Sequence, residues 1–112
     1  MCTKSDALII LKQVYNGCQD IFGNVKEAYL YGSYARGDYH KDSDIDILIT
    51  VEDPQSVISS HRTDIAVLSS NLSLEHDITV SISVKPAEQF ERLNKFLPFY
   101  QNVIKEGIKY AS

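Results

Sequence analysis

Tryptophan is absent from this 112-residue sequence, and cysteine, proline and glycine are scarce, with two, three and five residues. Cys2 and Cys18 are too few and too isolated for a disulfide framework or a zinc-binding knuckle. No apolar stretch reaches signal-peptide or membrane-spanning length, because Lys12 and Gln13 interrupt the first apolar run. These absences predict a cytoplasmic protein with no membrane segment.

Positive charge is also in deficit. Eleven basic residues stand against fifteen acidic ones, and a net charge of −4 has the wrong sign for a surface that collects many backbone phosphates. We therefore expect no extended nucleic-acid binding.

The length and the 44% hydrophobic content predict one globular domain over residues 1–112. A domain of this size buries a modest core, so a sizeable substrate must lie in an open cleft or be shared with another subunit.

The periodicity of the apolar residues changes several times along the chain. It is helical over 5–22, with Ser5 as the expected N-cap, and strictly alternating over 77–84, which predicts a half-buried strand. The same criteria predict strands at 25–31, 45–51 and 108–110, a helical turn at 33–38, a helix at 56–72, and helices that begin at Pro86 and Pro98. The helix after Pro86 is expected to pass through Phe96, and the last helix is expected to bury Val103 and Ile104.

Gly32 and Ser33 lie where the first strand gives way to a helical turn. Glycine lets a ligand approach the backbone closely, and Ser33 with the unpaired helical amides can face an anion. A phosphate group fits this arrangement.

Asp44 and Asp46 lie at the start of the next predicted strand. Residues i and i+2 of a strand share a face, so both carboxylates project together while Ile45 and Ile47 point into the core. The two carboxylates repel each other and have no cationic neighbour in this run. A divalent cation with oxygen ligands relieves the repulsion, and Mg²⁺ suits the site if triphosphate oxygens complete its coordination. A phosphate site beside a magnesium site indicates phosphoryl-group chemistry.

Three other interpretations use the same residues. Gly32 and Gly37 have the glycine spacing of a P-loop, but Asp38-Tyr39 replaces its lysine and hydroxyl residue. The aspartates also follow part of the spacing of a calcium-binding loop, but Ile47 stands where that loop needs glycine. The remaining alternative is an ordinary turn at Gly32-Ser33 followed by two solvated aspartates.

The combination of these pieces resembles a known family. Gly32-Ser33, then ten residues, then Asp44-x-Asp46 between apolar strands is similar to the signature of the nucleotidyltransferase superfamily that includes DNA polymerase β. The fuller runs GSYARGD and DSDIDILI, with the ending PFYQNVIKEGIKY, resemble the minimal nucleotidyltransferases of bacteria and archaea. The resemblance implies an α/β (α+β) fold, in which helices flank a small mixed β-sheet like that of the polymerase β palm.

The resemblance also implies roles for individual residues. Gly32 and Ser33 would hold the triphosphate of a nucleotide, with Arg36 as a further phosphate ligand unless it pairs with a nearby aspartate. Asp44 and Asp46 would bind two Mg²⁺ ions and act in catalysis.

A third carboxylate normally comes from a later strand in this family, and Asp77 is the candidate because it opens the alternating strand. It would bind a metal ion and help to deprotonate the acceptor. Its alternative is a solvated aspartate at the end of a strand. Tyr34 is expected to do no more than shape the mouth of the cleft.

The implied reaction moves a nucleoside monophosphate, with AMP from ATP as the first choice, to a hydroxyl acceptor. Relatives of this size often accompany a HEPN-family protein and act as antitoxins by adenylylating a tyrosine of that toxin, so a HEPN partner is the leading hypothesis. One alternative is a module that neutralises its partner by contact, with little or no catalysis. Another is transfer to a small hydroxyl compound, such as an aminoglycoside, with a partner subunit. A homodimer is a further possibility.

Overall fold

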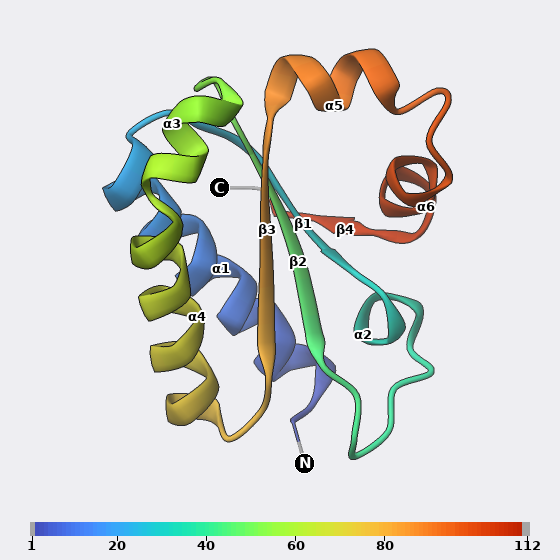
Figure 1. Cartoon of the computed structure of the whole chain (residues 1–112). Helices are drawn as coiled ribbons and strands as arrows, with labels where there is room; N and C mark the ends of the chain where they lie inside the picture. Colours follow the sequence, from blue (N-terminus) through green and yellow to red (C-terminus); the bar gives the residue numbers. More distant parts are fainter. Residues whose placement is uncertain (1, 111–112) are drawn as a thin grey trace.

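Four strands form one mixed sheet in the order β3-β2-β1-β4 in this computed structural model, which describes residues 2–110 (Figure 1). β1 (Val25–Tyr31) pairs antiparallel with β2 (Ile45–Val51) and with β4 (Ile108–Lys109). β2 pairs in parallel with β3 (Val80–Pro86), which requires a long crossover connection between them. The predicted mixed sheet with flanking helices is confirmed.

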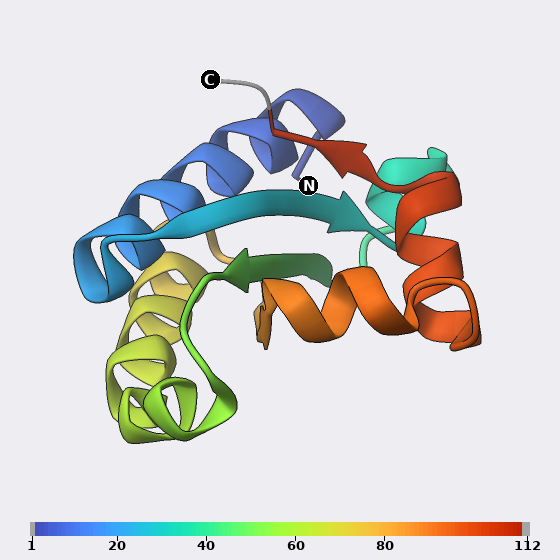
Figure 2. The same ribbon diagram turned by 90° about the horizontal axis from the view of Figure 1, so that it is seen from above.

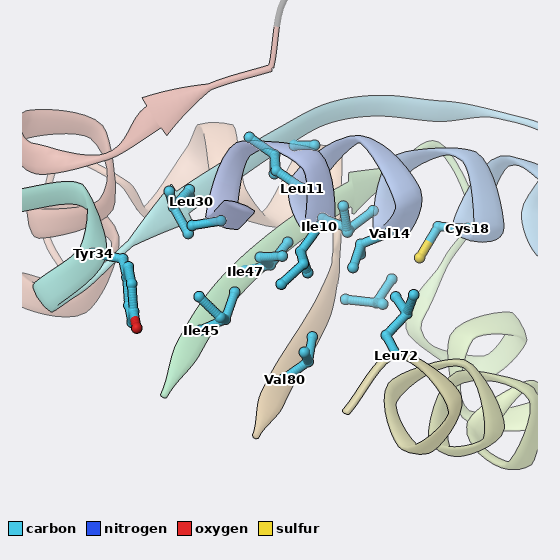
Figure 3. Packing of buried hydrophobic residues seen from close by; sticks show 14 of the residues in the cluster. Ile10, Leu11, Val14, Cys18, Leu30, Tyr34, Ile45, Ile47, Leu72 and Val80 are labelled. Atoms are coloured by element: carbon cyan, nitrogen blue, oxygen red, sulfur yellow. The ribbon is translucent and has the colours of Figure 1, made fainter. Parts of the chain in front are cut away.

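The helices cover the two faces of the sheet unequally. α1 (Lys4–Phe22) and α4 (Arg62–His76) pack on one face, and α5 (Ala87–Leu93) and α6 (Pro98–Glu106) lie on the other (Figures 1 and 2). The larger core forms beneath α1, whose apolar side chains meet those of the three long strands (Figure 3). No helix within residues 2–110 is long and apolar enough to cross a membrane.

The first helix begins two residues earlier than predicted. Thr3, and not Ser5, is its N-cap, because the Thr3 side chain accepts a hydrogen bond from the Asp6 amide at 3.2 Å. The Asp6 carboxylate in turn accepts from the Thr3 amide at 2.9 Å. This reciprocal pair is a capping box, which satisfies two amides that a helix start leaves without partners.

The single helix predicted over 56–72 is wrong, because the structure has two helices there, α3 (Gln55–Ser60) and α4. The Ser60 hydroxyl donates to the Val57 carbonyl at 2.6 Å, and the His61 amide turns to the Ile58 carbonyl instead. A serine side chain has here replaced a backbone amide as the donor, which interrupts the helical hydrogen-bond pattern.

The C-terminal elements differ from the prediction in two details. α5 ends at Leu93, so Phe96 lies in the connection to α6 and is 73% exposed. α6 buries Tyr100 and Val103, whereas Ile104 points outward and is 47% exposed, contrary to expectation. The short edge strand predicted at the end of the chain is confirmed as β4.

The C-terminal end of β1 and the N-terminal ends of β2 and β3 lie together at the same end of the sheet. The register pairs Tyr31 with Asp46 and Asp46 with Ser81, one residue from each long strand. α2 (Ser33–Arg36) follows β1 at this end of the sheet, below α6 in Figure 1. Most of the residues singled out in the sequence are therefore brought to one place by strand pairing.

Candidate active site

Asp44 and Asp46 lie at the start of β2, as the sequence predicted. Ile45 and Ile47 are fully buried beneath α1, so alternation along the strand places Asp46 on the opposite face. Burial and the neighbouring carboxylate of Asp44 raise the pKa of Asp46, while Arg36 lowers it to a lesser extent. The site therefore holds two mutually repelling carboxylates, one of them half-buried.

Gly32 fits closely against this pair. Its φ of 77° lies in the left-handed region, which a residue with a side chain rarely adopts. A Cβ atom at this position would lie only 2.6 Å from Oδ2 of Asp46. Glycine is thus required twice at residue 32, once by the backbone conformation and once by the carboxylate.

Ser33 is the first residue of α2, directly after Gly32. The amides of Ala35 and Arg36 both donate to the Gly32 carbonyl at 3.1 Å, so the chain reverses within one short turn. The turn follows directly on Gly32, which lies against Asp46, and it carries Arg36, whose charge acts on that carboxylate. Gly32 and Ser33 are the residues at which the sequence predicts a phosphate.

Arg36 makes two ion pairs on the surface. Its Nε donates to Oδ2 of Asp38 at 3.1 Å, and its Nη1 donates to Oε2 of Glu106 on α6 at 3.4 Å. The expected alternative for Arg36, a pair with a nearby aspartate, is therefore present in this structure. Because Arg36 also lowers the pKa of Asp46, its charge still acts on the carboxylate pair.

Asp77 does not lie where the sequence placed it. It is the C-cap of α4, with a left-handed φ of 52°, and β3 begins only at Val80, so the expectation that Asp77 opens the strand is wrong. Asp77 lines a hollow of 520 Å³ together with Cys2 and Asp6 from the start of the chain. The structure therefore groups Asp77 with the N-terminus of α1 and with Lys41, and does not cluster it with Asp44 and Asp46.

Ser81 occupies the β3 position beside Asp46. The two residues are register partners on parallel strands, so their side chains share the site face, and Ser83 lies two residues further along the same face. Within residues 2–110 no three carboxylate, imidazole or thiol groups come together in a cluster that could hold a metal ion. The carboxylates that could bind a cation at the site are therefore Asp44, just before β2, and Asp46 within it.

Tyr31, at the end of β1, is the register partner of Asp46 on the side away from Ser81. Burial and the Asp46 carboxylate raise the pKa of its phenol, and the Ser83 hydroxyl partly offsets this. The Tyr31 ring also packs edge-on against Phe99 of α6, with the ring centroids 5.4 Å apart. Sequence reasoning missed Tyr31 because strand register alone brings it to the aspartates.

A second hollow lies between the end of β1 with the following turn and α6. Its volume is 230 Å³. Its lining joins the site residues to one face of α6 and consists of Tyr31, Gly32, Arg36, Phe99, Asn102, Val103 and Glu106. The carboxylate pair is thus flanked by a hollow on the β1 side and by the hydroxyls of β3 on the other.

Tyr34 belongs to the core and not to the mouth of the cleft. Its side chain is only 1% exposed, its hydroxyl donates to the Cys2 carbonyl at 3.1 Å, and its ring stacks on Tyr39 with centroids 4.2 Å apart. The expectation that Tyr34 shapes the cleft is therefore wrong, and the residue instead fixes α2 against the N-terminal segment.

The donor chemistry of the site fits Mg²⁺ in part. Asp44 and Asp46 offer the hard oxygen ligands that this ion prefers, and burial together with the Asp44 charge raises the pKa of Asp46, which a bound cation would counteract. Two carboxylates leave most of an octahedral coordination shell open. Phosphate oxygens of a ligand or water molecules would have to fill it.

Comparisons with known proteins identify the family of the chain. A family model described as a nucleotidyltransferase domain matches residues 11–110. A protein of Methanocaldococcus jannaschii with the name "Putative protein adenylyltransferase" is 34% identical over 99 residues, which cover 87% of this chain and 90% of that protein. A second protein of the same name and organism is 42% identical over 52 residues, or 46% of this chain and 50% of the relative.

Solved structures share the fold at lower sequence identity. A structure described as a toxin-antitoxin with AMP-PNP superposes with a TM-score of 0.62 at 20% identity, over 90% of this chain and 73% of the other. A tri-AMPylated Shewanella oneidensis HEPN toxin in complex with its MNT antitoxin gives 0.58 at 17% identity, over 95% and 73% of the two chains. A structure from Sulfolobus solfataricus described as "a putative nucleotidyltransferase" gives a TM-score of 0.57 at 23% identity, over 96% of this chain and 85% of the other.

Proposed function

Because the chain belongs to the nucleotidyltransferase domain family, we propose that it transfers a nucleoside monophosphate from a nucleoside triphosphate, with ATP as the expected donor, to a hydroxyl group of another protein. The observation that carries the proposal is the contact between Gly32 and Asp46, which places a glycine turn directly against a pair of carboxylates.

The chain supplies three functions in this reaction. Asp44 and Asp46 would hold Mg²⁺, which supplies positive charge to the triphosphate and to the leaving pyrophosphate. Gly32 keeps the space above Asp46 open, and Ser33 and Arg36 would bind phosphate oxygens through charge-assisted hydrogen bonds. Arg36 would exchange its pair with Glu106 for the phosphates, because both partners of that pair are partly exposed to solvent.

The proposed acceptor is a tyrosine of a HEPN-family toxin, which would make this protein the antitoxin. Both relatives from Methanocaldococcus jannaschii carry the name of protein adenylyltransferases. Similar folds occur in toxin-antitoxin structures, one of which contains an AMPylated HEPN toxin.

Neutralisation by contact alone is the second candidate. Phe96 is 73% exposed, and Leu97 and Phe99 beside it are also exposed, so an apolar surface adjoins the site at the start of α6. Such a surface could bind a partner whether or not transfer occurs.

One experiment separates these functions. The protein, Mg²⁺ and ATP labelled on the α-phosphate are incubated with a HEPN-family ribonuclease from the same source, and both label on the ribonuclease and its RNA cleavage are measured. Asp44→Ala should abolish labelling and leave the ribonuclease active, since it removes one of two carboxylates. Asp20→Ala, an exposed site on α1, is the charge-matched control.

The outcomes point in different directions. Label on a tyrosine that is lost only in Asp44→Ala supports transfer. Inhibition of the ribonuclease by Asp44→Ala without any label supports contact. A labelled ribonuclease with unchanged labelling by Asp44→Ala overturns the proposed site.

A further inference from the structure

The two sides of the carboxylate pair differ in charge. On the β1 side, Gly32 is followed by α2 with Arg36, whose positive charge acts on Asp46. On the β3 side, the neighbours on the same face are the neutral hydroxyls of Ser81 and Ser83. A triphosphate is strongly anionic, so it belongs on the side of Arg36. The acceptor hydroxyl then approaches over β3.

β3 itself, over Val80–Pro86, carries no carboxylate or imidazole that could remove a proton from the acceptor. Asp46 faces Ser81 from β2, but the proposed function commits its oxygens, and those of Asp44, to Mg²⁺. Within residues 2–110 no third carboxylate or imidazole joins this pair in a cluster, and Asp77 lies with the N-terminus of α1. α5 begins only after Pro86, at the far end of β3, so its acidic residues lie away from Ser81.

We infer that Ser81 is a specificity-determining residue: because a serine stands beside Asp46 on β3, transfer requires an acceptor hydroxyl that ionises without a general base, which favours phenols over aliphatic alcohols. This inference rests on the proposed function and deepens it. A tyrosine phenol has an ordinary pKa of about 10, within reach of ionisation in neutral water, whereas serine hydroxyls do not titrate in that range.

The bond changes balance without a base from the protein. The phenol loses its proton to solvent water, and the phenolate oxygen forms a bond to the α-phosphorus of the nucleoside triphosphate. The bond between that phosphorus and the oxygen that bridges to the β-phosphate breaks, and pyrophosphate leaves with the electron pair. The products are the nucleotidylated acceptor, pyrophosphate and one proton.

The test varies the acidity of the acceptor with little change in its shape. The labelled tyrosine of the HEPN acceptor is replaced by 3-fluorotyrosine and by 3,5-difluorotyrosine, and initial rates of transfer from α-labelled ATP are compared at pH 7. Each unit by which fluorine lowers the phenol pKa raises the phenolate fraction about tenfold, offset in part by weaker nucleophilicity. With the wild-type enzyme, the rate should therefore rise severalfold along the series.

Substitution of Ser81 supplies the second readout. Ser81→Asp places a carboxylate beside the acceptor, and a positioned base contributes about 10²- to 10⁴-fold in rate. We expect Ser81→Asp to accelerate transfer to ordinary tyrosine and to remove the dependence on fluorination. Ser81→Asn has nearly the same size without the charge, and we expect it to keep the wild-type dependence.

The possible results test the inference about Ser81 and the proposed function separately. A wild-type rate that ignores fluorination overturns the inference while the nucleotidyltransferase function stands. Equal rates and equal fluorine dependence in Ser81→Asp and Ser81→Asn also overturn it. An acceptor that the wild-type enzyme does not label at all contradicts the proposed function itself, and the inference falls with it. The wild-type series alone decides the question if Ser81→Asp fails to fold.

Discussion

Gly32 and Asp46 constrain each other at the centre of the site. Gly32→Ala should cost about 1–3 kcal/mol of stability, because alanine is strained at positive φ. It should also abolish transfer, since the new Cβ would displace the Asp46 carboxylate. Gly37→Ala is a matched control, with a φ of 88° and no atom near the added Cβ. Urea unfolding and initial rates of transfer measure both effects.

The control sets the standard for the result. Gly37→Ala should lose a similar amount of stability and keep its activity. If the two variants are equally active, the close contact at Gly32 has no part in catalysis.

Asp46 should destabilise the protein at neutral pH in the absence of metal. Its pKa is raised by burial and by Asp44, so the folded state binds its proton more tightly than the unfolded state. Stability therefore falls as the pH rises from the ordinary pKa of aspartate, about 4, through the raised value. Asp46→Asn should unfold at a higher urea concentration than the wild type at pH 7 in EDTA, with little difference near pH 4.

Added Mg²⁺ should reverse this order. Binding to the folded state stabilises the wild type by mass action, whereas Asp46→Asn has lost a ligand. Asp20→Asn controls for the loss of one surface charge. A wild type that Mg²⁺ does not stabilise, with or without nucleotide, would contradict the assignment of the ion to these carboxylates.

Sequence reasoning identified the residues whose relation is local. The pair Asp44 and Asp46 follows from the two-residue period of one strand, and Gly32 from a turn at the end of another. Sequence reasoning misplaced Asp77. The residues before Val80 continue the apolar-polar alternation of β3, although they belong to the end of α4 and to a loop. The roles of Tyr31 and Ser81 could not be predicted, because they depend on the pairing of three strands distant in sequence.

At the scale of elements, β3 is held at the outer edge of the sheet by α4. The Val80 amide donates to the Ser73 hydroxyl at 2.9 Å, and the Ser69 hydroxyl donates to the Val80 carbonyl. These serines take the place of a further strand at this point of the edge. β3 is thereby fixed where it presents Ser81 to the site.

Ser73→Ala tests this attachment. It leaves the Val80 amide without its partner, which should cost about 1–3 kcal/mol in the free energy of unfolding. Ser70→Ala, on the exposed side of the same helix, should change stability by less than about 0.5 kcal/mol. Urea denaturation of both variants provides the comparison. Equal stabilities would show that the bonds from α4 do not hold β3 in place.

At the scale of the whole molecule, one face of the sheet forms the larger core and the other face carries the candidate site. One face carries the larger core, with α1 and α4 packed on it, and Cys18 lies there with the pKa of its thiol raised by burial to about 12 (Figure 3). The other face carries the smaller cluster beneath α5 and α6 and leaves its lower part to the site. The burial of Ile45 and Ile47 was predicted from the alternation of β2 and is confirmed. The exposure of Phe96 and Ile104 was not predicted, because helix ends and rotation depend on packing partners.

The identity of the transferred group is the most direct test of the whole account. ATP labelled on either the α- or the γ-phosphate is incubated with the protein, Mg²⁺ and the HEPN acceptor, and the acceptor and the released phosphates are separated. We expect α-label on the acceptor, γ-label in pyrophosphate, and loss of both products in Asp46→Asn. Label from the γ-phosphate on the acceptor, or unchanged transfer by Asp46→Asn, would contradict it.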